Sequence, residues 1–249
     1  MIENIRLYAD GAEYDLIYND GAAAFWLAQA QRYGGPVLEL ACGTGTNLLP
    51  IARAGFDAAG IDLSPAMLET ARQKARAAGL SLAWLEADMR AFDLQRQFRF
   101  VFLASNTLCH LLDNADFSAC MAAVQRHLAP AGRFMIDVFV PNVRLLARPP
   151  EIQSTFAIYD DPAGRGQVEI TYTAVYEPDT QINRIRMHYQ YPWIDEPVEA
   201  DLPMRIYFPQ ELDALLRCHG FEIEAKYGDR DLSPFSAASP QQIYVLRAP

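Results

Sequence analysis

A short glycine-rich segment holds the residues whose types and spacing could do chemistry. It reads Val-Leu-Glu-Leu-Ala-Cys-Gly-Thr-Gly-Thr over residues 37–46, and Gly-Ile-Asp-Leu-Ser follows at residues 60–64. The pattern predicts a buried strand, a turn at Gly43 and Gly45, a helix start, and a second strand that ends in Asp62. Glycines let a ligand approach bare backbone, and an acid one strand later can accept hydrogen bonds from ribose hydroxyls. These residues therefore predict a nucleoside site.

The glycine spacing restricts which ligand the turn can hold. A dinucleotide site uses Gly-x-Gly-x-x-Gly, and here the third glycine position is Leu48. A phosphate-binding P-loop needs Gly-Lys-Ser/Thr, which does not follow the turn. Two further acids belong to the set, because Asp88 follows the third apolar segment and Glu39 lies inside the first one, where burial demands a partner. The pattern disfavours a pyrophosphate cofactor.

The segment Glu39-Leu-Ala-Cys-Gly-Thr-Gly, together with Asp62, resembles motif I of the class I S-adenosylmethionine-dependent methyltransferases. Later segments resemble that family's pattern in the expected order, at residues 85–89, 100–106 and 128–134. The resemblance is close over residues 37–140 and looser in the flanks. It implies S-adenosyl-L-methionine as the cofactor and a small molecule as the methyl acceptor.

The resemblance also implies roles for single residues. In the family the glycine loop lies against the methionine part of the cofactor, the acid matching Asp62 binds the ribose, and the acid matching Asp88 binds the adenine amino group. A segment like Tyr14-Asp-Leu-Ile-Tyr18 closes over the cofactor. The expected cofactor-binding residues are therefore Tyr18, Glu39, Ala41, Cys42, Gly43, Gly45, Asp62, Leu63, Met67, Asp88, Met89, Ser105 and Asn106.

Tyr14, Tyr18 and His110 are the candidate catalytic residues. His110 follows the fourth predicted strand, where the acceptor and the methyl donor should meet, and a histidine can take a proton near neutral pH. A purely structural His110 is an equal alternative. Met67 is as compatible with a core position as with the site, and Cys42 has no visible activating neighbour. No His/Asp/Glu cluster has metal-ligand spacing, so no metal is expected.

Composition favours a small-molecule enzyme. The chain has 249 residues, of which 51% are hydrophobic and 21% charged, and its formal net charge is -10. Nucleic-acid binding needs clustered Lys and Arg, so this acidic balance gives no reason to expect it. The four cysteines are scattered and are interpreted as reduced thiols. No secretory pattern and no apolar run of about 20 residues occurs, so we expect a cytoplasmic chain that does not bind membranes.

Strand and helix patterns alternate through the first part of the chain. They predict an α/β protein with a doubly wound, mostly parallel, Rossmann-like sheet, whose ligands bind beyond the carboxyl ends of the strands. Strands are expected at residues 37–41, 57–61, 81–85, 98–104 and 133–140, and helices at 47–54, 65–78 and 116–128.

After Pro141 the apolar residues recur with period two, which predicts an antiparallel sheet inserted after the fifth strand. Its strands are expected at residues 152–159, 167–177, 182–191 and 198–208. A helix at 209–219 and strands at 221–227 and 242–247 should return to the first sheet. We therefore expect a cofactor domain of residues 1–143 and 209–249, and an inserted subdomain of residues 144–208.

The inserted sheet is rich in aromatic residues, which can line a substrate pocket, form a core, or make a homodimer contact. His188 lies in this sheet and is a further candidate to face a substrate. By resemblance, the insert is the specificity element or a dimer surface, and the sequence does not choose between the two.

These observations predict methyl transfer from S-adenosylmethionine to a nitrogen or oxygen of a small molecule. Nitrogen is favoured because the insert resembles that of small-molecule N-methyltransferases, including those that act on amino sugars. The alternatives are a nucleotide-dependent oxidoreductase, a non-catalytic module that binds S-adenosylmethionine or S-adenosylhomocysteine, and a protein methyltransferase. Cofactor titration separates the first alternative, and turnover separates the second.

Overall fold

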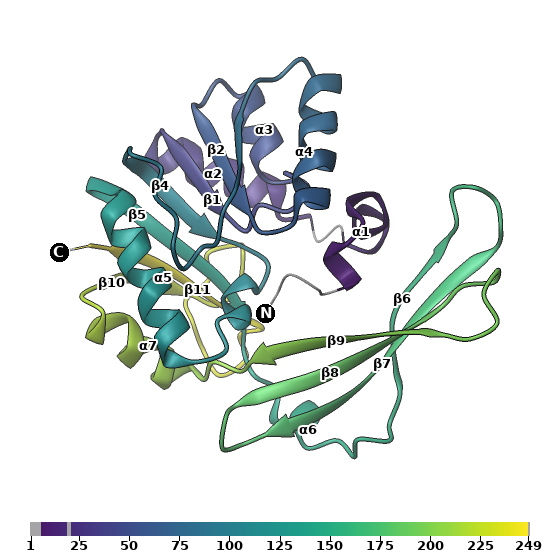
Figure 1. Cartoon of the computed structure of the whole chain (residues 1–249). Coiled ribbons are helices and arrows are strands. Elements are labelled where there is room, and N and C mark those ends of the chain that lie inside the picture. The colour runs from purple at the N-terminus through teal and green to yellow at the C-terminus, as the bar shows by residue number, and fades with distance from the viewer. Residues whose placement is uncertain (1–5, 19–20, 249) are drawn as a thin grey trace.

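The computed structural model of the chain describes residues 6–18 and 21–248. Its larger sheet has seven strands in the order β10-β11-β5-β4-β1-β2-β3 (Figure 1). Five of these strands, β5, β4, β1, β2 and β3, run parallel to one another. Strand β11 runs antiparallel to both β10 and β5. The bounds are Val37–Leu40 for β1, Ala58–Asp62 for β2, Ala83–Glu86 for β3, Phe98–Leu103 for β4, Leu128–Phe139 for β5, Glu222–Tyr227 for β10 and Gln241–Arg247 for β11.

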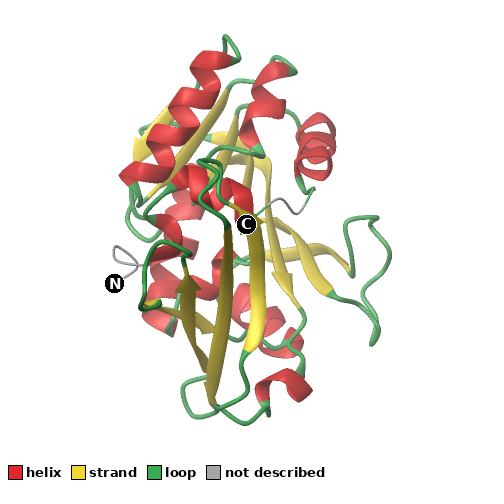
Figure 2. Ribbon diagram, turned by 90° about the vertical axis from the view of Figure 1, so that its right-hand side faces the viewer, coloured by secondary structure: helices red, strands yellow, loops and turns green. Residues whose placement is uncertain are grey.

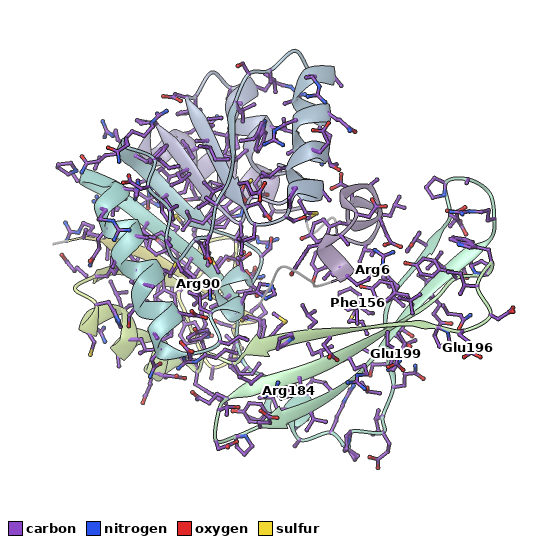
Figure 3. All side chains as sticks on the ribbon, viewed as in Figure 1. Arg6, Arg90, Phe156, Arg184, Glu196 and Glu199 are labelled. Atoms are coloured by element: carbon purple, nitrogen blue, oxygen red, sulfur yellow. The ribbon has the colours of Figure 1, made fainter. Side chains whose placement is uncertain are left out.

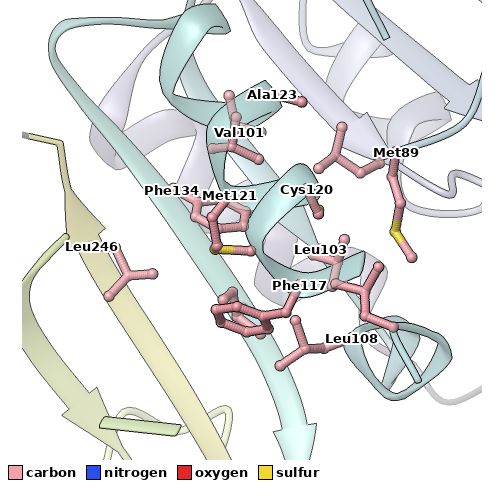
Figure 4. Close-up of a cluster of buried hydrophobic side chains, with 14 of the residues drawn as sticks. Met89, Val101, Leu103, Leu108, Phe117, Cys120, Met121, Ala123, Phe134 and Leu246 are labelled. Carbon is pink, nitrogen blue, oxygen red and sulfur yellow. The ribbon is translucent and has the colours of Figure 1, made fainter. Parts of the chain in front are cut away.

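Helices cover both faces of this sheet (Figure 2). One face packs against α5 and α7, through a cluster that includes Phe117 and Met121 (Figure 4). The other face packs against α2, α3 and α4, where the Trp26 ring stacks on Phe102 with 4.5 Å between centroids. The bounds are Ala23–Tyr33 for α2, Leu48–Arg53 for α3, Pro65–Ala77 for α4, Asn114–His127 for α5 and Pro209–Cys218 for α7.

The central strand β4 shows why its sequence folds this way. From residue 100 to 103 its side chains alternate between the two faces, since Phe100 and Phe102 join the cluster on one side and Val101 and Leu103 the cluster on the other. All four are fully buried. A strand that is apolar on both faces is the mark of a parallel sheet covered by helices, so the expected doubly wound fold is confirmed.

The predicted helices and strands of this part are confirmed to within a few residues, with one clear difference at β5. This strand was expected to begin at Arg133, but it begins at Leu128, directly after α5. Leu128 already pairs with Phe98 of β4, and the pairing shifts register before it resumes at Phe100 and Arg133. The segment Ala-Pro-Ala-Gly is therefore an irregular part of the strand, with Ala131 at φ +61°.

A four-stranded antiparallel sheet, in the order β6-β7-β8-β9, follows β5. One of its faces carries the side chains that period two assigned to it, and Val168, Ile170, Met187 and Tyr189 are buried there. The expected inserted sheet is confirmed. The bounds are Val143–Leu146 for the short helix α6 that precedes it, Ser154–Asp160 for β6, Gln167–Glu177 for β7, Ile182–Gln190 for β8 and Val198–Arg205 for β9.

The N-terminal helix α1 (Gly11–Ile17) lies between the two sheets (Figure 1). Asp10 caps it by accepting hydrogen bonds from two backbone amides of its first turn. Gly11 packs so closely on α4 that a Cβ there would lie 2.5 Å from Thr70 Oγ1. A single turn of 3-10 helix, η2 (Arg6–Tyr8), precedes α1. Within the described residues, no helix combines the length and apolarity needed to cross a membrane.

Candidate active site

A cleft opens where the strand order of the larger sheet reverses, at the carboxyl ends of β1 and β4. It encloses about 820 Å³, including its open mouth. Its floor comes from the residues that follow three strands, with Ala41 and Gly43 after β1, Leu63 after β2, and Ser105 after β4. Such a reversal point is where α/β sheets bind their ligands, because the loops on either side diverge and leave a crevice.

The backbone around the cleft is held in unusual conformations. Three residues have φ values in the left-handed region, which residues other than glycine rarely adopt: Ala41 at +50°, Ser105 at +54° and Asn106 at +63°. Each such conformation costs about 1–3 kcal/mol and persists only where the surrounding structure enforces it. At Asn106 the backbone N–H donates to Asp137 O at 3.1 Å, and the side-chain Oδ1 accepts from Phe139 N at 2.8 Å. β5 therefore fixes the loop that follows β4.

Asp62 is oriented by the glycine turn and by the helix that follows it. Its Oδ2 accepts from the backbone N–H of Gly43 at 2.8 Å, and its Oδ1 accepts from that of Ser64 at 2.8 Å. Burial raises the pKa of the Asp62 carboxyl from its usual value. Ser64 takes the cap position of α4, because its Oγ accepts from Met67 N at 3.2 Å. Asp62 thus presents a fixed carboxylate at the cleft, which suits a ribose.

A polar extension of the cleft reaches Glu39, Cys42, Thr44 and Asn47. Glu39 is only 2% exposed, and its Oε1 accepts from Asn47 Nδ2 at 2.8 Å. The acid inside the apolar strand is thus held by the residue that precedes α3, and it could also accept from a ligand ammonium. Burial raises the pKa of the neighbouring Cys42 thiol, so this cysteine is not an activated nucleophile.

Two residues of the expected set do not line the cleft. Gly45, with φ +76°, packs against the Trp84 ring, and a Cβ there would lie 2.5 Å from it. Asp88 accepts from Arg90, whose Nη1 also donates to Asp116 at 2.8 Å. Arg90 holds the pKa of the Asp88 carboxyl below its usual value. The other expected residues do border the cleft or its extension: Tyr18, Glu39, Ala41, Cys42, Gly43, Asp62, Leu63, Met67, Met89, Ser105 and Asn106.

The candidate catalytic residues gather at the mouth of the cleft. Tyr14 and Tyr18 line it from α1, and their rings stack with 5.0 Å between centroids. His110 lines it from the turn after β4, where burial lowers its pKa to about 4. The imidazole is therefore neutral at physiological pH. That value makes His110 a weak base, which favours a hydrogen-bonding role over proton abstraction.

Tyr8 is one of several cleft residues that sequence reasoning missed, along with Leu202 and Met204. Its hydroxyl lies 2.8 Å from His110 Nε2, and its ring packs 5.9 Å from that of Tyr14. His110 Nδ1 is buried without a hydrogen-bond partner among the described residues, so the tautomer that carries its proton on Nε2 avoids an unsatisfied N–H. In that tautomer the Tyr8 oxygen accepts from His110, and the hydroxyl proton stays available to a ligand. The closeness of Tyr8 to Tyr14 and Tyr18 in the sequence was the available signal.

Helix α1 is fastened on two sides. Glu13 Oε1 accepts from the hydroxyls of Tyr159 and Tyr191 of the inserted sheet, at 2.6 and 2.7 Å. Two residues later, Asp15 pairs with Lys74 of α4 at 2.8 Å, and Lys74 also donates to Thr44 of the glycine turn at 3.1 Å. The helix that carries Tyr14 and Tyr18 is therefore held by both sides of the cleft.

The residues present fit S-adenosylmethionine. The left-handed backbone at Gly43 leaves space that a side chain would fill, since a Cβ there would lie 3.3 Å from Met67. Glu39 can face an ammonium and Asp62 a ribose, while Met67 and Met89 offer apolar surface to a purine. Among the described residues, no three His, Cys, Asp or Glu side chains gather as a metal site would require.

Comparison with known proteins agrees with this geometry. Residues 37–132 match the family model described as a methyltransferase domain. A putative methyltransferase of Bacillus subtilis, YqeM, is 34% identical over 114 residues, which are 45% of this chain and 46% of the relative. The dTDP-3-amino-3,4,6-trideoxy-alpha-D-glucopyranose N,N-dimethyltransferase of Streptomyces venezuelae is 34% identical over 101 residues, 41% of each chain. The chain thus matches less than half the length of either relative.

The likeness to a solved structure extends over nearly the whole chain. The CcbJ methyltransferase from Streptomyces caelestis superposes with a TM-score of 0.82 at 25% identity, over 97% of both chains, so the inserted sheet is part of the shared fold. Residues 37–132 are therefore a methyltransferase domain, and the chain has the fold of the class I S-adenosylmethionine-dependent methyltransferases.

Proposed function

We propose that the protein transfers a methyl group from S-adenosylmethionine to a nitrogen of a small-molecule acceptor. The observation that carries this proposal is the meeting of Gly43, Asp62 and Ser105 around one cleft with His110 and three tyrosines at its mouth. The Streptomyces venezuelae relative supports nitrogen, because its name describes a dimethyltransferase of an amino sugar. Oxygen remains the second choice of atom.

The protein's part in this reaction is to bind, orient and exclude water. When bound, the cofactor supplies an activated sulfonium methyl group, which an acceptor attacks in line. Asp62 would hold the ribose and Glu39 the ammonium, which fixes the methyl donor. The aromatic rings of Tyr8, Tyr14 and Tyr18 close the mouth and exclude water, so that positioning supplies most of the rate.

Tyr8 and His110 would position the acceptor nitrogen rather than take its proton. The acceptor amine must be neutral when it attacks the methyl group. If it arrives protonated, a neutral His110 adds no positive charge that would repel it. The Tyr8 oxygen, which accepts from His110 Nε2, can also accept from an N–H of the acceptor, and this leaves the nitrogen lone pair free to attack. Burial raises the pKa of the Tyr8 hydroxyl well above its usual value, so it acts as a neutral phenol that positions the nitrogen.

Calorimetric titration with S-adenosylmethionine tests the cofactor assignment. We expect affinity in the micromolar range, and Asp62→Ala should remove most of it, because about 1.5–3 kcal/mol accompanies each hydrogen bond to a charged group. A tighter signal with NAD(H) would favour an oxidoreductase instead. Release of S-adenosylhomocysteine with a panel of amines and alcohols then tests transfer, and binding without any turnover would indicate a non-catalytic module.

A further inference from the structure

A second cavity adjoins the cleft on the side of the inserted sheet. It encloses about 1150 Å³, including its open mouth, and we call it the apolar chamber. Its walls are one face of the inserted sheet, together with α6 and residues 148–152 that lead into that sheet. Tyr18, Leu202 and Met204 line both the apolar chamber and the cleft. A ligand in the chamber can therefore reach the site of methyl transfer past three side chains.

The chamber walls are unusually apolar for a surface open to solvent. Leu145 of α6 and Ile152 are each 46% exposed, although both line the chamber. Opposite them lie Phe156 and Tyr172, whose rings meet edge to face at 6.4 Å. A ligand that covers these side chains removes apolar area from water, which is the usual driving force for binding in such a cavity.

The charge of the chamber restricts the ligand further. Among the described residues that line it, Arg148 is the one charged side chain, and its Nη1 donates to Ser154 Oγ at 3.1 Å. A nucleoside diphosphate brings two or more negative charges, which proteins usually meet with several cations or with a helix N-terminus. A chain with a net charge of -10 gives such an anion no general attraction either.

A row of aromatic rings leads from the chamber to the cleft. Phe156 lies 5.9 Å from Tyr18, Tyr18 stacks on Tyr14, and Tyr14 lies 5.9 Å from Tyr8 (ring centroids). Figure 3 shows Phe156 on the inserted sheet, on the side that faces α1. The row ends at the Tyr8 hydroxyl, which is the polar group at which an amine would be positioned.

We infer that the apolar chamber binds the body of the acceptor, and that this body is an uncharged aromatic or aliphatic group attached to the amine. The nitrogen passes Tyr18 and Met204 to reach the cleft. This inference rests on the proposed function and makes it more specific, because it excludes an acceptor carried on a nucleoside diphosphate. The acceptor named for the Streptomyces venezuelae relative, a dTDP-linked amino sugar, therefore does not transfer to this chain.

Fluorescence titration with phenylnaphthylamine, a neutral apolar dye, measures binding in the chamber. We expect saturable binding by the full-length protein and a loss of about tenfold in affinity in Ala174→Phe, which fills the chamber from β7. The matched control is Val175→Phe, since the next residue of the same strand is 48% exposed and lies outside the chamber. Asn183→Phe narrows the same chamber from β8 and serves if the first variant does not fold.

Competition with the dye then identifies the ligand class. Phenylbutylamine should displace the dye, whereas thymidine diphosphate and ethanolamine at the same concentration should not. Displacement by thymidine diphosphate, or equal dye binding by Ala174→Phe and Val175→Phe, would overturn the inference. Calorimetry with S-adenosylmethionine on the same samples separates the two proposals. If the unaltered protein does not bind the cofactor, the proposed function is contradicted. If it binds the cofactor but not the dye, only the inference about the chamber is contradicted.

Discussion

We expect the two sides of the cleft to recognise their ligands by different means. On the cofactor side, much of the lining is backbone that follows parallel strands, joined by the carboxylates of Glu39 and Asp62, and conformations such as those of Ala41 and Ser105 fix its shape. On the acceptor side, the contacts come from side chains of β7, β8 and β9. A surface made of backbone survives changes of side chain, whereas a surface made of side chains changes with each substitution. One fold can therefore keep its cofactor while its acceptor varies.

The two sides also differ in packing. The larger sheet is buried between two clusters of mostly fully buried side chains, while the inserted sheet has one smaller cluster, around Ile170 and Tyr189. Half-exposed residues such as Ile158 and Val175 remain on the inserted sheet. A region with fewer buried contacts opens at lower cost. We therefore expect the inserted sheet to adjust to its ligand more readily than the cofactor side does.

The largest expected effect is the loss of cofactor affinity when a side chain is placed in the glycine turn. Gly43→Val places a β-branched residue at φ +53° and a Cβ 3.3 Å from Met67, so affinity for S-adenosylmethionine should fall by about a thousandfold. Calorimetry measures the loss. Gly55→Val is the control, because Gly55 also has a left-handed φ, +89°, but its added Cβ meets nothing within 4 Å. Comparable loss in both variants would place the cause in general destabilisation.

Acid should destabilise the folded chain through His110. The pKa of His110 is lowered to about 4 in the folded chain, against about 6.5 in an unfolded one, so the unfolded state binds more protons between these values. The free energy of unfolding should thus fall by up to about 3 kcal/mol as pH decreases from about 6.5 to 4.

Denaturant melts at several pH values measure this slope. His110→Asn should flatten it. An equal slope in His110→Asn and the unaltered protein would assign the acid sensitivity to other groups.

Tyr8→Phe separates transfer from cofactor binding. The change removes only the hydroxyl that meets His110 Nε2, so we expect turnover to fall by about thirtyfold while affinity for S-adenosylmethionine changes by less than about threefold. Rates of S-adenosylhomocysteine release and calorimetry provide the two numbers. Tyr33→Phe, on α2 away from the cleft, is the matched control. Unchanged turnover in Tyr8→Phe would remove this tyrosine from the reaction.

Substitutions at two residues of α1 should each affect a different ligand. Glu13→Gln weakens the tie to the inserted sheet and should raise KM for the acceptor by about tenfold, with little effect on cofactor affinity. Asp15→Asn weakens the tie to Lys74 and the glycine turn, and should lower cofactor affinity by about tenfold instead. Steady-state kinetics, with the concentrations of the cofactor and the acceptor varied separately, test whether each variant affects a different ligand. If the two variants lose the same parameter, the helix does not distinguish its two sides.

The smallest effect is expected at His188. Its Nδ1 lies 3.4 Å from Glu199, and His188 is not among the described residues that line the cleft or the apolar chamber. Turnover by His188→Ala should stay within about twofold of the unaltered protein, as for most substitutions at exposed or half-buried positions. A larger loss would restore the expectation that this histidine faces a substrate.

The sequence predicted the parts of the molecule that depend on local patterns. Period two placed β7 at residues 167–177, where the structure has it, and the strand ends brought Asp62, Met89 and Ser105 to one cleft. Local patterns do not reveal a tertiary partner, so the pairing of Arg90 with both Asp88 and Asp116 and the packing of Gly45 on Trp84 were missed. The contact of Tyr8 with His110 joins residues 102 positions apart.

The double fastening of α1 has a consequence for the timing of a catalytic cycle. Its tyrosines border the cleft, while its acids hold the inserted sheet through Tyr159 and the glycine turn through Lys74. A ligand that leaves past α1 requires this helix to move, and any such movement strains both attachments at once. We therefore expect the methylated product and S-adenosylhomocysteine to leave in one opening event, whose rate sets an upper limit on turnover however fast the transfer itself is.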